Sequence, residues 1–228
     1  MPDLGETSAV IPARDEAGAI GDVVAEAVRV VDRVVVVDDG STDATASEAR
    51  RAGAAVVSLH PGRGKGHALR TGVQRAGGDT IVLLDGDGQD DPRDIPALLA
   101  SIEAGADVVI GTRFATAARS AGVAAIDRAG NRMLTELLNA LFGVRLTDTQ
   151  AGFRALRRPM WETLALRAEG FEIETEVLVR ALQRGADVRE VAVARHPRVH
   201  GQRVLHRLRD GLAILGCMVR LRLQPPPV

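Results

Sequence analysis

The sequence is poor in cysteine and in aromatic residues: its 228 residues include one cysteine, no tyrosine and only 2% aromatic side chains. A single cysteine, Cys217, excludes an internal disulfide and offers no metal-ligand spacing, so we expect it to be a small apolar residue in a helix. Hydrophobic residues make up 46% of the chain. Because so few of them are aromatic, the core must be built from Val, Leu, Ile and Ala. The length allows one large α/β domain or two small ones.

An excess of charge of one sign is also missing. The formal net charge of −1 argues against electrostatic binding of nucleic acid by the protein as a whole, so we expect no nucleic-acid partner. Residues 1–8 lack the basic and apolar regions of a signal peptide, and the apolar run at 211–219 is too short to span a bilayer. We therefore expect a soluble cytoplasmic protein.

The end of the chain departs from this balance. From residue 195 onward, seven arginines accompany one acid, Asp210. Such a segment is typical of a solvated basic face, but it also suits anionic lipid or a phosphate-bearing substrate. Peripheral contact with the cytoplasmic face of a membrane is therefore compatible with the sequence.

Apolar runs alternate with helical periodicity through residues 7–113. The pattern predicts strands at 8–12, 34–37, 54–59, 81–84 and 107–113, and helices that include 18–31, 68–76 and 93–104. This alternation is typical of a doubly wound, mostly parallel sheet with helices on both faces. Beyond residue 114 the rhythm changes: a mobile loop is expected at 115–125, a half-exposed strand at 188–194 and a basic amphipathic helix at 204–223.

Two carboxylates follow the strand predicted at residues 81–84. Asp85 and Asp87 are two positions apart, and in extended backbone such side chains point to the same side. Gly86 and Gly88 lack side chains, which we expect to let a ligand approach the main chain. Hard oxygen ligands suit Mg²⁺ or Mn²⁺ beside a phosphate, although a solvated acidic loop before a helix explains the same residues.

Polar residues also follow other predicted strands. Asp38 and Asp39 end the strand at 34–37, at the carboxyl edge where open α/β sheets bind ligands. A Gly-rich turn at 62–67 leads into a helix and carries Lys65, the only lysine among 29 basic residues. A compact ammonium at a helix start favours an anion site, but the spacing does not match a P-loop.

Six short segments follow one another along the chain: IPARDE at 11–16, VDDGSTD at 37–43, GKG at 64–66, DGDGQ at 85–89, GTR at 111–113 and DTQAGF at 148–153. Together, and in this order, they resemble the inverting family-2 glycosyltransferases of the GT-A fold, in which DGDGQ is a DXD-type motif. Within that family the sequence is most similar to the polyprenyl-phosphate (dolichyl-phosphate) mannosyl- and glucosyltransferases. The resemblance implies one GT-A domain over residues 1–224. Residues 1–113 would bind the nucleotide sugar, and residues 114–224 would bind the acceptor and end in amphipathic helices.

The resemblance also implies roles on the donor side. Asp85 and Asp87 would hold Mg²⁺ or Mn²⁺ against the donor diphosphate, with Gln89 as a third oxygen ligand. The ion would neutralise charge on the departing nucleoside diphosphate. The remaining donor contacts would come from Pro12, Ala13, Glu16, Asp38 and Asp39 around the nucleoside, and from Arg14, Lys65 and Gly86 near the diphosphate.

On the acceptor side, the roles depend on the acceptor. A lipid phosphate is already anionic and needs orientation, which arginine forks provide; the candidates are Arg113, Arg128, Arg132 and Arg198. A hydroxyl acceptor would need a base, for which Asp148 is the first choice. The family's late Arg-x-x-Gly-x-Ser-Lys stretch reads RVHGQRV at 198–204, so Arg203 keeps a positive charge there but the serine and lysine are missing.

Other functions stay open from the sequence. The same donor chemistry could serve a sugar, a glycolipid or a small soluble acceptor. A sugar nucleotidyltransferase has a similar sheet, but its basic Gly-rich loop follows the first strand, whereas here it follows the third. A non-enzymatic binding protein would be expected to have lost the acidic pair. Many relatives carry transmembrane helices beyond this region, so a lipid acceptor would here be met at the membrane surface.

Overall fold

A computed structural model describes residues 4–114, 125–198 and 206–224. Most of the loop predicted at 115–125, as well as Arg203, lies outside these ranges. The described residues form a seven-stranded sheet with the order β3-β2-β1-β4-β6-β5-β7. The strands are β1 (Thr7–Ala13), β2 (Arg33–Asp38), β3 (Ala55–Ser58), β4 (Thr80–Leu83), β5 (Val108–Thr112), β6 (Arg154–Arg157) and β7 (Val188–Ala192).

The sheet is mostly parallel, as predicted. The ladders β3-β2, β2-β1, β1-β4 and β5-β7 are parallel, whereas β6 runs antiparallel to both of its neighbours, β4 and β5. Continuous β-branched sequence suits the central strands because both of their faces are covered. In β2, for example, Val34 and Val36 enter one core cluster, and Val35 and Val37 enter the other.

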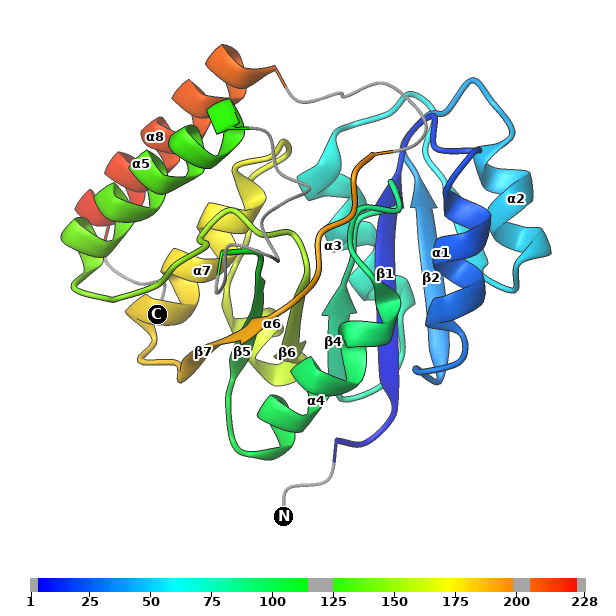
Figure 1. Ribbon diagram of the computed structural model, residues 1–228, viewed down its shortest axis with the longest axis horizontal. Coiled ribbons are helices and arrows are strands. Elements are labelled where there is room, and N and C mark those ends of the chain that lie inside the picture. The colour runs from blue at the N-terminus through cyan, green and yellow to red at the C-terminus, as the bar shows by residue number, and fades with distance from the viewer. Residues whose placement is uncertain (1–3, 115–124, 199–205, 225–228) are drawn as a thin grey trace.

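Helices cover both faces of the sheet (Figure 1). One face packs against α1 (Ile20–Ala27), α2 (Thr45–Arg51) and α4 (Ile95–Glu103), which follows the 3-10 turn η1 (Pro92–Asp94). The other face packs against α3 (Lys65–Arg75), α6 (Arg158–Thr163) and α7 (Ile173–Gln183). The doubly wound α/β arrangement predicted from the alternation is confirmed.

Two further helices form an outer layer. α5 (Ala125–Phe142) and α8 (Arg207–Leu223) lie beside each other and pack with α7 around a third apolar cluster, on the side of the molecule away from α2 (Figure 1). Cys217 is buried in this cluster, as expected for a small apolar helix residue. Among the described helices, none combines enough length and hydropathy to cross a bilayer.

Element boundaries differ from prediction in two helices, and the second difference bears on the site. α1 ends at Ala27 rather than at residue 31, because the chain turns after it. α3 begins at Lys65, three residues earlier than predicted, directly after Gly64, whose φ of 95° is poorly accessible to other residues. Lys65 therefore lies on the first turn of a helix and not in a loop.

Candidate active site

The predicted polar segments meet at one edge of the sheet. The parallel strands β1, β2 and β4 are neighbours, so the residues after their carboxyl ends lie side by side. Because β6 runs in the opposite direction, the segment that precedes it, residues 148–153, reaches the same edge. The first turn of α7 and the segment after β7 complete the site, as the contacts below demonstrate.

Asp85 belongs to a buried chain of three charges. The Nζ of Lys65 lies 2.6 Å from Asp85 Oδ1 and 2.6 Å from Glu174 Oε1, and the three side chains are at most 24% exposed. Burial disfavours the charged form of Lys65, but the two carboxylates outweigh it and raise the lysine pKa. Lys65 in turn outweighs the burial of Asp85 and lowers the pKa of that carboxyl. Lysine and aspartate are therefore both ionised.

Asp87 lies in a second charge cluster. Arg198 Nη1 is 3.2 Å from Asp87 Oδ2, and Arg198 Nη2 donates to Glu16 Oε1. Burial raises the pKa of Glu16 to about 7 despite the opposing charge of Arg198, and the nearby Asp87 and Asp85 add to the rise. The pKa of Asp87 is raised by burial and then by repulsion from Asp85. Glu16 Oε2 is buried and has no hydrogen-bond partner among the described residues.

These contacts leave the site short of positive charge. In the described part of the chain, four carboxylates (Glu16, Asp85, Asp87 and Glu174) are paired with two cations, Lys65 and Arg198. A divalent ion would restore the balance, and oxygen ligands suit Mg²⁺ or Mn²⁺. No group of three or more acidic, histidine or cysteine side chains within the described ranges forms a complete metal cage. Mg²⁺ usually takes one or two carboxylates together with substrate phosphates, so Asp85 and Asp87 would be enough to hold it.

The geometry that we assumed for the acidic pair is wrong in one respect. The chain is not extended through Asp87 but turns at Gly86 and Asp87. Gly86 is buried, and an added Cβ would lie 3.1 Å from Ile20 Cδ1 and 3.2 Å from Ala13 Cβ. The missing side chain at Gly86 is thus explained by packing against β1 and α1, and not by an opening for a ligand.

Gln89 faces a neighbouring ion pair. Its Oε1 accepts from Arg195 Nη2 at 2.9 Å, and Arg195 Nη1 lies 2.6 Å from Asp90 Oδ1. Burial disfavours the charge of Arg195, but Asp90, Asp87 and Asp85 outweigh it and raise the pKa of the guanidinium. These contacts hold segment 193–198 against Gln89 and Asp90, which brings Arg198 close to Asp87. A metal-ligand role for Gln89 would use the second lone pair of Oε1, beside the one that accepts from Arg195.

Asp38 and Asp39 shape the adjoining loops. Asp38 Oδ1 accepts from Ser41 N at 2.9 Å, and the two oxygens of Asp39 accept from Arg63 N and Gly64 N at 2.6 and 2.8 Å. Backbone donors therefore engage one oxygen of Asp38 and both oxygens of Asp39, and Asp39 fixes the Gly-rich turn before Lys65. Three further predicted donor residues occupy the end of β1 or the position just after it: the half-buried Pro12, the buried Ala13 and the exposed Arg14.

Asp148 is fully buried and fully engaged. Its oxygens accept from Arg113 Nε at 2.6 Å, Arg113 Nη2 at 2.7 Å and Asn131 Nδ2 at 2.6 Å. Burial disfavours its charge, but Arg113 outweighs this effect and keeps the carboxyl pKa below its usual range. These contacts describe a carboxylate that orients Arg113 rather than one that is free to take a proton.

The other arginines predicted for the acceptor do not gather around Arg113. Arg128 and Arg132 lie on the exposed side of α5, and Arg132 Nε is 2.7 Å from Glu136 Oε1 in a pair whose side chains are 82% and 63% exposed. Arg198 instead joins the donor-side carboxylates. Only Arg113 and Arg198, of the four, are built into the edge of the sheet.

The comparison with known sequences decides the family. The sequence profile of glycosyl transferase family 2 matches residues 8–164, more than half of the chain. The chain belongs to glycosyl transferase family 2. It is 34% identical to glycosyltransferase AglJ of Haloferax volcanii over 92% of this chain and 70% of AglJ. It is also 31% identical to a dolichyl-phosphate hexose transferase of the same organism, over 96% of this chain and 95% of the relative.

The fold of this family 2 glycosyltransferase also matches a solved structure. Glucosyl-3-phosphoglycerate synthase from Mycobacterium tuberculosis, crystallised with Mn²⁺, UDP and phosphoglyceric acid, aligns with a TM-score of 0.76. The alignment covers 97% of this chain and 80% of that protein at 24% identity. The predicted GT-A fold and the predicted glycosyltransferase activity are thus both confirmed.

Several residues that build the glycosyltransferase site were missed or left without a definite role. Among them are Arg195, Asp90 and Glu174, to which the sequence assigned no definite role. Arg154 is fully buried and donates to the carbonyls of Ala151, Thr149 and Glu174, which braces the segment before β6 against α7. Burial lowers the pKa of Arg154 to about 10. β6 carries an arginine at each end, Arg154 and Arg157, so the sequence did not distinguish which of the two is fully buried.

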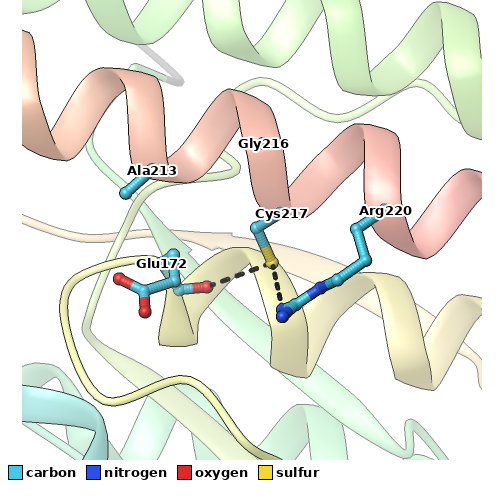
Figure 2. A pocket seen from close by; sticks show the side chains of 5 residues that line it. All are labelled: Glu172, Ala213, Gly216, Cys217 and Arg220. Atoms are coloured by element: carbon cyan, nitrogen blue, oxygen red, sulfur yellow. Dashed lines mark hydrogen bonds between the residues drawn. The ribbon is translucent and has the colours of Figure 1, made fainter.

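A separate pocket lies where α8 passes the start of α7 (Figure 2). Glu172, Ala213, Gly216, Cys217 and Arg220 line this pocket of about 200 Å³. Burial raises the pKa of Cys217 to about 11, so the thiol stays neutral. None of the residues assigned above to donor or acceptor lines this pocket.

Proposed function

We propose that this glycosyltransferase moves a hexose, with inversion, from a nucleoside diphosphate sugar (UDP- or GDP-linked) to polyprenyl phosphate. The observation that carries the proposal is the cluster of Glu16, Asp85 and Asp87 at the carboxyl edge of β1 and β4, where carboxylates outnumber the cations paired with them. Residues 1–113 would hold the donor, and residues 114–224 of the same domain would hold the acceptor. The relative named dolichyl-phosphate hexose transferase, which matches nearly end to end, supports this acceptor class.

On the donor side, Asp85 and Asp87 would hold Mg²⁺ or Mn²⁺, with Gln89 as a further ligand. The ion, when bound, supplies charge neutralisation for the departing nucleoside diphosphate. Lys65, fixed as an ammonium by Asp85 and Glu174, would offer a donor to the diphosphate oxygens. Arg198 is paired with Asp87 and Glu16. When the donor binds, its guanidinium would leave these carboxylates and contact the substrate.

On the acceptor side, the state of Asp148 favours an acceptor that needs no base. Asp148 is buried and paired through two nitrogens of Arg113, so it would orient that guanidinium toward an anionic group. A phosphate oxygen attacks without losing a proton, whereas a hydroxyl requires proton removal. A lipid phosphate would be met by a peripheral protein on the cytoplasmic face of the membrane.

The test measures release of nucleoside diphosphate. The protein is incubated with Mn²⁺ or Mg²⁺ and with UDP- or GDP-hexoses, with and without detergent-solubilised polyprenyl phosphate. We expect release that requires both the metal and the lipid phosphate. Release that requires a sugar or another hydroxyl acceptor instead, with polyprenyl phosphate inert, would refute the acceptor assignment.

A further inference from the structure

Large apolar side chains on the surface are concentrated on the outer layer. Of the eight exposed large apolar side chains in the described part of the chain, seven lie on α5 or α8 and only Val28 lies elsewhere. The three most exposed belong to α8: Leu208 at 85%, Leu223 at 80% and Leu212 at 69%; Val219 of the same helix is 53% exposed. A gathering of this kind on one layer marks an interaction surface, since isolated apolar side chains would be scattered.

The exposed residues of α8 form a single stripe. At 3.6 residues per turn, Leu212, Val219 and Leu223 fall close to the direction of Leu208. The buried residues of the helix point the opposite way, toward α5 and α7; they are Asp210, Ile214, Cys217, Met218 and Leu221. The helix is therefore apolar on two opposite sides, and packing of the fold uses only one of them.

Arginines border this stripe. The helical period places Arg209 and Arg220 along one side of it and Arg222 along the other. The Arg209 and Arg220 side chains are 76% and 47% exposed. The only acid of α8, Asp210, is buried; its Oδ2 accepts from His206 N, and its Oδ1 lies 3.2 Å from Arg209 Nε, so Arg209 stays exposed but has one acidic neighbour. We call the stripe and its bordering arginines the outer face of α8.

We propose that the outer face of α8 docks the protein onto an anionic membrane surface, with the helix lying in the plane of the interface. An apolar stripe bordered by arginines is suited to this position, because leucines enter the acyl boundary while guanidinium groups meet lipid phosphates. Pairing with a second copy of this face would bring the arginine borders together, so charge favours anionic lipid as the occupant. The inference goes beyond the proposed reaction, since it requires no particular acceptor.

The experiment is flotation of the full chain with lipid vesicles, either of phosphatidylcholine alone or with about a third phosphatidylglycerol. We expect flotation only with the anionic vesicles, and loss of it at high salt. Leu208→Gln/Leu212→Gln should lower the partition coefficient at least about tenfold. Arg209→Gln/Arg222→Gln should lower it by about fivefold per arginine. Val28→Gln, which alters an exposed apolar side chain away from α5 and α8, is the matched control.

Two results would overturn the docking surface. The first is wild-type protein that stays with the soluble fraction, or a Leu208→Gln/Leu212→Gln variant that floats like wild type. The second is a wild-type dimer in light scattering that this variant converts to a monomer, which would make the face a contact between copies. Circular dichroism checks folding, and Val219→Gln/Leu223→Gln repeats the test at the other end of the stripe. Nucleoside diphosphate release in detergent is measured separately, so loss of docking is distinguished from failure of the proposed reaction.

Discussion

The substitution Asp148→Asn separates an orienting carboxylate from a catalytic base. The change keeps the size of the side chain but removes the charge opposite Arg113, whose side chain is only 14% exposed while Asp148 is not exposed at all. Leaving one partner of a buried ion pair unpaired costs about 3–5 kcal/mol. A domain of this size loses about 2–4 °C in melting temperature per kcal/mol, so we expect a fall of about 6–20 °C.

Thermal and urea unfolding followed by circular dichroism measure this effect. The matched control is Glu136→Gln, which breaks the exposed pair with Arg132 and should leave the melting temperature nearly unchanged. In a double-mutant cycle, Arg113→Gln combined with Asp148→Asn should destabilise less than the two single changes added together. If Asp148→Asn melts within about 2 °C of wild type while turnover disappears, Asp148 is a base and our account of the acceptor side is incorrect.

Three further predictions concern the donor side. Asp85→Asn and Asp87→Asn should each lower metal-dependent nucleoside diphosphate release by about 100-fold or more with the fold intact by circular dichroism; normal turnover of both in excess chelator would contradict the metal site. Gly152→Ala would place a Cβ 2.9 Å from Lys65 Nζ and 3.0 Å from Asp85 Oδ2, so we expect turnover to fall on the order of 10- to 100-fold; unchanged kinetics would show that both side chains shift freely. The pKa of Glu16 is raised from 4.5 to about 7, so the folded state holds the proton over this interval and stability should fall as pH rises through it. Glu16→Gln should flatten that dependence in urea titrations, and an unchanged slope would assign it to another group.

The positions of the strands and of the polar residues after them could be read from the sequence. Runs such as residues 34–37 are apolar and β-branched because both faces of β2 are buried. Once the strands are parallel neighbours, the residues that follow them share an edge, which brings Asp39 and Asp85 to one site. This part of the prediction depends only on local pattern and on the geometry of parallel sheets.

The pairing of charges across the site could not be read in the same way. Arg195 meets Asp90 across 105 residues, and Arg198 meets Glu16 across 182 residues. Nothing in a local pattern selects one arginine among 28 for such a contact. The direction of β6 was equally hidden, because a four-residue strand buried on both faces fits a parallel or an antiparallel neighbour. The charge pairing and the direction of β6 are both set only when the second half of the chain folds.

The ε-amino group of Lys65 is unique in the sequence, and the fold encloses it between two carboxylates that keep it protonated. Acylating reagents attack only a neutral, accessible amine. Native molecules should therefore leave this position unmodified, whereas unfolded ones take up the label. Mass spectrometry of one peptide would then count the fraction of molecules with an assembled site, without any substrate and before the reaction is known.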